Sequence, residues 1–308
     1  MLYRQFGNTG WSFSAIGLGT WNIGNQWGEL DDATSFGTVK SALDNGVNVF
    51  DTAESYGIPN GLSEERLGAA LSGQRHNTYV ISKIGNWGVR TGQGVPKTTE
   101  DMIILCAHAS LFRLRTDYHD ILLCHENKIE DPSVYISAFD ELVKRGNLRK
   151  YGISTDHLDV LKRFNQNGKC AAVEIDYSLI NKEPEYNGML DYCAENGIGV
   201  LIRGPLAKGL LSGKYSRNSV FSDSIRAAWN EGETQHETFK ANMERAEEIG
   251  KFVPAEKMAE TALKYIISHP HMPVAIPGAK SAAQAAQNAA AGDSLLSSEM
   301  YAKLKELK

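Results

Sequence analysis

Short runs of apolar and β-branched residues alternate with longer amphipathic segments from about residue 14 onward. This alternation is typical of βα units around a parallel sheet. Eight strands that each feed a helix favour a closed (β/α)8 barrel over an open doubly wound sheet, because closure leaves no exposed strand edge. The expected strands cover residues 14–20, 47–53, 78–84, 119–125, 150–155, 171–179, 199–204 and 273–278.

Side chains that can cap helices follow several of these strands. We expect helices to begin near Ser63, Asp131, Asp156 and Ser281. Hydroxyl and carboxylate oxygens at such positions accept hydrogen bonds from the first amides of a helix.

Two segments depart from the βα alternation. Residues 3–14 contain two short β-like runs around 8–10, which predicts a hairpin that caps one end of the barrel. Residues 206–253, after the seventh strand, are first rich in glycine and then charged and helical. Long insertions in compact folds are usually binding loops or lids. With no internal repeat and no interdomain linker, residues 1–308 are expected to form one barrel domain.

Composition narrows the class of protein. With 42% hydrophobic and 22% charged residues, the chain can bury a large core. The 32 basic and 37 acidic residues give a formal charge of -5 without a dense basic block, which argues against nucleic acid as a partner. No stretch reaches the roughly 18 apolar residues of a membrane helix, and the first residues lack a signal-peptide pattern, so we expect a cytoplasmic protein. Reduced core cysteines are expected at Cys106, Cys124, Cys170 and Cys193, which form no C-x-x-C pair.

Polar residues that close apolar strands are the candidates for chemistry, because the carboxyl ends of barrel strands face the active site. Asp51, Lys83 and His125 close three such strands, and Tyr56 follows Asp51 on the loop. Singly, they could be a helix cap, a surface charge and a core histidine. Together they indicate a site, because a buried carboxylate and a buried ammonium each cost several kcal/mol unless they pair.

Such a cluster can tune the acidity of Tyr56. A free tyrosine has a pKa of about 10, and a neighbouring lysine is expected to lower it towards neutrality. Asp51 would hold Lys83 in its charged form, and the imidazole of His125 would orient a substrate oxygen.

Several dispersed motifs resemble the aldo-keto reductase family. They are DTAESYG (51–57), SEERLG (63–68), SKIG, ILLCHE, GISTD, RGPLAKGLLSGKY and IPGAKSAAQAAQN, together with the opening YRQFGNTGWSFSAIGLGTW. The resemblance implies NAD(P)(H)-dependent interconversion of an aldehyde, ketone or sugar carbonyl and its alcohol, on a (β/α)8 barrel without a metal. It also implies that Asp51, Tyr56, Lys83 and His125 form the catalytic tetrad, with Tyr56 as the proton donor.

The loops after strands seven and eight suit a dinucleotide, because barrels bind phosphate there at helix N-termini. The resemblance places the adenosine end at Lys280, Ser281, Gln284 and Asn288, which favours NADP(H) while NAD(H) stays possible. Ser281 and Gln284 also satisfy a capping box that needs no ligand. The complete expected cofactor set is Ser154, Thr155, Glu174, Arg203, Gly204, Pro205, Leu206, Lys208, Gly209, Lys214, Gly278, Lys280, Ser281, Gln284 and Asn288.

The nicotinamide end departs from the family pattern. Family members usually present Ser, Asn and Gln to the carboxamide, and the matching residues here are Ser154, Thr155 and Glu174. Arg203 takes the place of the aromatic residue that commonly stacks on the ring. Because an arginine also has a planar face, we expect Arg203 to lie beneath the ring and to pair with Glu174 across neighbouring strands.

The substrate contacts and rival functions are less specific. Trp21 and Trp87 are expected to wall the substrate pocket, with Asn86 and Arg90 nearby, although either tryptophan could be a core residue. A metal-dependent barrel isomerase or hydrolase is an alternative, which the ammonium of Lys83 disfavours. A nucleotide-binding regulatory subunit is another. Neither the substrate nor the oligomeric state follows from the sequence.

Overall fold

The computed structural model describes residues 1–307 and shows eight parallel strands in sequential order. Residue pairs Ile16–Ala275 and Gly19–Gly278 bridge the first and last strands, and the amide of Gly17 donates to the carbonyl of Ala275 at 2.8 Å. These bridges close the sheet on itself, so the barrel prediction is confirmed. The strands are β3 (Leu18–Gly19), β4 (Val49–Asp51), β5 (Tyr79–Ile84), β6 (His119–Cys124), β7 (Leu148–Ser154), β8 (Cys170–Asp176), β9 (Gly199–Arg203) and β10 (Val274–Ala275).

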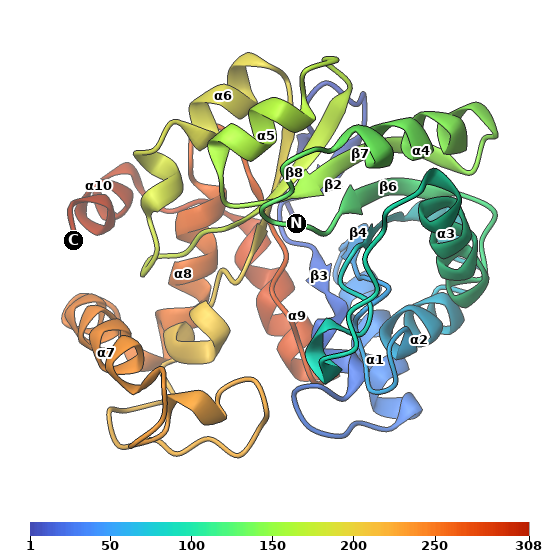
Figure 1. Ribbon diagram of the computed structural model, residues 1–308. Coiled ribbons are helices and arrows are strands. Elements are labelled where there is room, and N and C mark those ends of the chain that lie inside the picture. The colour runs from blue at the N-terminus through green and yellow to red at the C-terminus, as the bar shows by residue number, and fades with distance from the viewer. Residues whose placement is uncertain (308) are drawn as a thin grey trace.

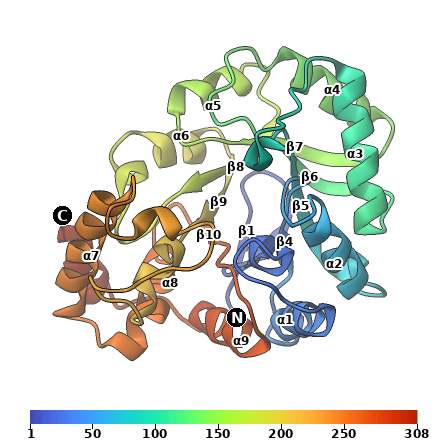
Figure 2. The same ribbon diagram turned by 60° about the horizontal axis from the view of Figure 1, so that its bottom comes forward.

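Helices surround the sheet in chain order, and α1 packs against α9 where the ring closes (Figures 1 and 2). Within residues 1–307, no helix is both long and apolar enough to cross a membrane. The helices are α1 (Asp32–Asp44), α2 (Leu62–Ala70), α3 (Glu100–Leu114), α4 (Ser133–Lys144), α5 (Leu158–Phe164), α6 (Met189–Glu195), α7 (His236–Gly250), α8 (Met258–Ile267), α9 (Ala282–Ala290) and α10 (Ser298–Glu306).

Both predicted departures from the βα alternation are present. Strands β1 (Tyr3–Gln5) and β2 (Ser12–Ser14) form an antiparallel hairpin. The stacked rings of Phe6 and Phe13, 4.3 Å apart, join the apolar interior of the barrel. The insertion after β9 contains two short 3-10 helices, η5 (Ala207–Ser212) and η6 (Ala227–Trp229), followed by α7. In Figure 1 this insertion lies at the lower left, and Ser224 within it donates to the carbonyl of Gln26 in the loop between β3 and α1 at 3.4 Å.

Helices begin close to all four predicted starts, but two of the predicted capping side chains have tertiary partners instead. Ser281 does cap α9, accepting from the Gln284 amide at 3.2 Å, and Asp131 accepts from the Ser133 amide at 2.9 Å. Ser63, however, lies inside α2, where its hydroxyl donates to the Thr20 carbonyl at 2.8 Å. Asp156 precedes α5 by two residues and pairs with a side chain of β9 instead.

Candidate active site

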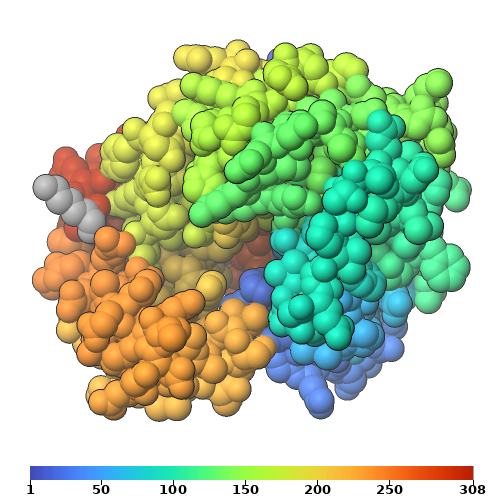
Figure 3. All heavy atoms as spheres, viewed as in Figure 1, coloured from blue at the N-terminus to red at the C-terminus, as the bar shows by residue number. Residues whose placement is uncertain are grey.

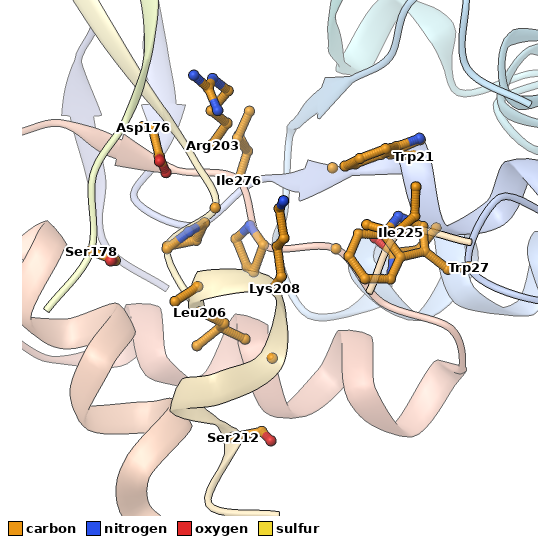
Figure 4. Close-up of a pocket in the computed structure, with 18 of the residues that line it drawn as sticks. Trp21, Trp27, Asp176, Ser178, Arg203, Leu206, Lys208, Ser212, Ile225 and Ile276 are labelled. Carbon is orange, nitrogen blue, oxygen red and sulfur yellow. The ribbon is translucent and has the colours of Figure 1, made fainter. Parts of the chain in front are cut away.

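The carboxyl ends of the strands open into a cavity of about 1880 Å³. The hollow lies between the insertion after β9, orange in Figure 3, and the blue and teal segments that follow β3 and β5. Tyr56 and His125 line it, as do Trp21 and Arg203 from opposite sides (Figure 4). The polar residues that close the strands therefore converge as expected.

Lys83 is the centre of the predicted tetrad. Its side chain is fully buried, and its Nζ lies 2.6 and 2.7 Å from the two carboxylate oxygens of Asp51. The same ammonium donates to the Thr52 carbonyl at 2.9 Å and lies 3.2 Å from the hydroxyl of Tyr56. Lys83 and Asp51 meet because β4 and β5 are adjacent parallel strands with their carboxyl ends together.

The acidity expected for Tyr56 is not what the structure supports. Burial raises the pKa of Tyr56 above its ordinary value, and Lys83 lowers it again. Asp51 and Glu174 then raise the pKa of Tyr56 further, so the pull of the lysine is offset. Although burial alone would lower the pKa of Lys83, the same two carboxylates raise it. Tyr56 is therefore a protonated phenol at neutral pH and holds a proton to donate.

His125 faces the cavity beside Tyr56, with ring centroids 6.0 Å apart in an edge-on arrangement. Burial lowers the pKa of His125 well below its ordinary value, and the positive charges of Lys83 and Arg203 lower it further. Its Nδ1 has no hydrogen-bond partner among the described residues. The side chain is therefore a neutral imidazole, which can donate one hydrogen bond to an oxygen in the cavity.

Glu174 does not pair with Arg203, so that prediction is wrong. In the register of β8 and β9, Glu174 lies opposite Leu201, while Arg203 lies opposite Asp176. Because two residues along a strand span about 6.6 Å, Glu174 lies a layer below the mouth. There it is fully buried, does not line the cavity, and places Oε2 3.1 Å from Nζ of Lys83.

Arg203 instead has acidic partners at the mouth. Its Nη2 forms an ion pair with Oδ2 of Asp156, and Asp176 lies on the neighbouring strand (Figure 4). Burial alone would lower the pKa of Arg203, but Asp156, Asp176 and, more weakly, Glu174 raise it. A compensated guanidinium thus lines the cavity where the aromatic residue of the family was expected.

Of the other two residues expected to contact the nicotinamide carboxamide, one lines the cavity and one does not. Ser154 lines the cavity, as predicted. Thr155 does not line it, because its hydroxyl is used within the loops: it donates to the Asn127 carbonyl at 2.6 Å and accepts from the His157 amide at 3.2 Å. Asn127 lines the cavity in its place.

The loop after β9 lines the cavity in an unusual backbone conformation. Ala207 and Lys208 hold positive φ angles of 48° and 53°, which costs non-glycine residues about 1–3 kcal/mol each and is typical of functional loops. Gly209, with a φ of 96°, completes the turn. The predicted residues of this loop that line the cavity are Gly204, Pro205, Leu206, Lys208, Gly209 and Lys214.

At the start of α9, all but one of the residues expected at the adenosine end line the cavity. Gly278, Lys280, Gln284 and Asn288 line the cavity, but Ser281 does not, because its hydroxyl caps the helix. The side chain of Gln284 accepts from the Lys280 amide at 2.8 Å. The first two amides of α9 keep no intrahelical acceptor, as at every helix N-terminus, so this end of the cavity can receive an anion.

The part of the cavity beside Tyr56 is walled by one tryptophan that the sequence indicated and one that it did not. Trp21 stacks on Tyr56 with ring centroids 5.8 Å apart, and Trp27 meets Trp21 edge-on at 5.1 Å. Trp87 does not line the cavity: the guanidinium of Arg113 lies 5.4 Å from its ring.

The polar residues of the substrate end, Asn86 and Arg90, do line the cavity, as expected. Among the residues that were missed, Trp27, Asn127 and Asn181 also line it. All three lie on loops that follow strands, and this position was the only sequence signal that could have indicated them. No periodicity distinguishes them from other residues of these loops.

Comparisons with known proteins give consistent matches. Residues 15–308 match the model of the Aldo/keto reductase family. The chain is 30% identical over 296 residues to aldo-keto reductase YhdN of Bacillus subtilis (strain 168), with 92% of this chain and 86% of that protein covered. It is 28% identical over 297 residues to methylglyoxal reductase YeaE of Escherichia coli (strain K12), with 95% and 90% covered.

Comparison with solved structures gives matches to the same family. The holo form of aldo-keto reductase AKR11C1 from Bacillus halodurans superposes with a TM-score of 0.82 at 27% identity, covering 100% of this chain and 96% of that one. An aldo-keto reductase from Klebsiella pneumoniae in complex with NADPH superposes with a TM-score of 0.73 at 27% identity, covering 100% and 95%.

Proposed function

The chain belongs to the aldo/keto reductase family of NAD(P)H-dependent oxidoreductases, and on that premise we propose that it interconverts a small aldehyde or ketone and the corresponding alcohol. The observation that carries the proposal is the contact of 3.2 Å between the Tyr56 hydroxyl and Lys83 Nζ, at the edge of the cavity. In this proposal Asp51, Tyr56, Lys83 and His125 act as the tetrad.

The proton route follows from the geometry of the tetrad. Tyr56, protonated at neutral pH, donates to the carbonyl oxygen as negative charge develops on it. The neutral imidazole of His125 donates a hydrogen bond to the same oxygen and orients the carbonyl. Lys83, held in place by Asp51, stabilises the phenolate that remains. The dinucleotide supplies the hydride when it is bound.

The cavity fits a dinucleotide in size and in chemistry. Lys208 and Lys214 lie along the loop after β9, and Lys280 stands at the amide end of α9. These cations suit the phosphates of NADP(H), which we favour over NAD(H) because Lys280 adds a positive charge where a 2′-phosphate would bind. The NADPH complex of the Klebsiella pneumoniae enzyme supports the same choice.

The substrate class follows from the walls around Tyr56. Trp21 and Trp27, in edge-on contact, supply an apolar wall, while Asn86 and Arg90 supply polar groups to the same cavity. This combination suits small oxygenated carbonyl compounds such as 2-oxoaldehydes and open-chain sugars. The name of the methylglyoxal reductase relative supports this class.

A substrate and cofactor screen tests the proposal. Methylglyoxal, simple aldehydes, ketones and sugars are incubated with the protein and NADPH or NADH, and the reduced-nicotinamide absorbance is followed. We expect consumption of NADPH with at least one small aldehyde. Quenching of tryptophan fluorescence on NADPH titration reports binding separately, because Trp21 and Trp27 line the cavity. Binding without turnover of any carbonyl compound would favour the regulatory subunit instead.

A further inference from the structure

Two buried carboxylates face one buried ammonium in the tetrad. Asp51 contacts Lys83 Nζ through both oxygens, at 2.6 and 2.7 Å, and Glu174 contacts it at 3.1 Å from the opposite side of the barrel interior. Glu174 and Lys83 have no exposed surface, and Asp51 is 3% exposed. Beyond the ion pair, neither oxygen of Glu174 has a hydrogen-bond partner among the described residues. The cluster thus holds one more acidic group than it has cations.

Within residues 1–307, no second cation compensates the additional carboxylate. On β7, Ser154 lies opposite Glu174 and is uncharged. On β9, Arg203 is already paired with Asp156 at the mouth. His125, after β6, is a neutral imidazole, and Tyr56 is a neutral phenol. An ammonium has three protons to donate, and Asp51 and the Thr52 carbonyl already accept from it at short distances.

We propose that Asp51 and Glu174 share one proton beside Lys83 at neutral pH, and that Glu174 is a positioning residue that sets the pH at which Tyr56 gives up its proton. The inference rests on the proposed function only in giving Tyr56 its role. Two carboxyl groups that contact the same ammonium in a dry site do not both ionise readily, so together they keep a proton over a wider pH range than either group alone. Consistent with this, burial raises the pKa of Asp51 well above its ordinary value, and Glu174 raises it further.

The shared proton biases the direction of the reaction. Alcohol oxidation needs Tyr56 as a phenolate, and loss of the shared proton at higher pH adds a negative charge that opposes the phenolate. Carbonyl reduction needs the neutral phenol, which the same charge favours. A neutral amide at position 174 would remove the opposing charge and would let the phenolate form at lower pH.

The variant Glu174→Gln tests the proposal in solution. Because glutamine imitates the protonated acid in shape and charge, the buried site should keep its packing, and the result is read from the pH dependence of the variant's own activity. The pH profile for alcohol oxidation should move to lower pH by about one unit or more, which is about tenfold in phenolate population. An unchanged profile overturns the proposal.

A matched control separates charge from structure. Glu64→Gln also removes a fully buried carboxylate, one that pairs with Arg113 at 2.6 Å and accepts from Ser82, the neighbour of Lys83, at 2.6 Å. This control should lose stability and leave the pH profile unmoved. A shift of equal size in Glu64→Gln would reduce Glu174 to a structural role and overturn the proposal.

Infrared difference spectra test the shared proton without catalysis. At pH 7, the spectrum of wild type minus that of Glu174→Gln should show the C=O stretch of one protonated carboxyl group. The spectrum of wild type minus that of Asp51→Asn should show the same band. With two variants, the test still works if one of them fails to fold. Absence of the band from both difference spectra refutes the shared proton.

The activity of Tyr56→Phe separates failure of this inference from failure of the proposed function. If Tyr56→Phe proved fully active, the proposed function would fail, while the infrared spectra would still decide whether the proton is shared. If Tyr56→Phe were inactive and the Glu174→Gln profile matched wild type, only this inference would fail.

Discussion

Replacement of Arg66 by methionine should loosen the loop that carries the substrate wall. Arg66 lies on α2, is 7% exposed, and reaches residues 20–31, the loop after β3. Its Nη1 donates to the carbonyl of Ile23 at 2.6 Å, and its Nη2 donates to the carbonyl of Leu30 at 2.7 Å. Its Nε contacts Asp32 at 2.8 Å. Because Nη1 also donates to Oδ1 of Asn25 at 2.8 Å, the guanidinium fastens the loop at Ile23, Asn25 and Leu30, and it contacts Asp32 at the start of α1.

The size of the effect follows from these contacts. A hydrogen bond from a charged donor contributes about 1.5–3 kcal/mol, so the two carbonyl contacts together contribute about 3–6 kcal/mol. The pair with Asp32 adds little, because that carboxylate is 66% exposed and screened by water. At about 2 °C per kcal/mol for a large domain, the Tm of Arg66→Met should fall by roughly 6–12 °C.

Thermal unfolding followed by circular dichroism measures this fall, and Lys40→Met is the control. Lys40 also pairs with an acid, Asp44 at 2.6 Å, but both side chains are exposed, at 73% and 58%. Its loss should change stability by about 0.5 kcal/mol or less. If Arg66→Met melted within about 2 °C of Lys40→Met, the idea that Arg66 anchors the loop would be refuted.

Two further predictions concern the cofactor and the pH dependence. Asp156→Asn leaves Arg203 less compensated, so it should weaken binding of the oxidised cofactor, whose nicotinamide ring is positively charged, about tenfold more than binding of the reduced form. Calorimetric titration of both forms measures the difference, and equal losses would place the nicotinamide away from Arg203. Because the pKa of Tyr56 is raised, the acid form is present at neutral pH and is lost only as the pH rises through that raised value. The rate of carbonyl reduction should therefore be flat between about pH 6 and 8, and a steep fall there would contradict the assignment of the phenol.

The barrel was predictable because its strands have a clear sequence pattern. Runs such as 79–84 and 119–124 are short, apolar and almost wholly buried, and each precedes an amphipathic helix. Asp51, Lys83 and His125 were predictable for the same reason, since each closes or directly follows a strand and must then lie at one end of the barrel. Parallel strands bring such positions together whatever the intervening loops do.

The error at Glu174 has a different cause. Which layer of the barrel a side chain occupies depends on the stagger between strands, and the apolar pattern does not encode that stagger. The sequence prediction placed Glu174 one layer too close to the mouth and therefore paired it with Arg203 instead of Lys83. The acidity of Tyr56 was misjudged mainly because burial raises the pKa of Tyr56, and further because Asp51 and the misplaced Glu174 raise it too.

The remaining errors concern side chains whose partners are distant in the chain. Asp156 carries the composition of a helix cap, yet it accepts from the Asp176 amide at 2.8 Å and pairs with Arg203. Trp27 and Trp87 both follow strands, and only the loop conformation decides that Trp27 faces the cavity. Local signals cannot resolve such competition, since the local and the distant partner satisfy the same polar atoms.

The central claim is that the Tyr56 phenol supplies the proton for carbonyl reduction. Its most direct test is the single-turnover rate at which Tyr56→Phe oxidises NADPH with methylglyoxal as the substrate. The NADPH concentration is chosen so that wild type and variant are both saturated, as judged by tryptophan fluorescence. Loss of a positioned general acid should lower this rate by about 10²–10⁴-fold with cofactor affinity unchanged. A Tyr56→Phe rate within threefold of wild type would contradict the account.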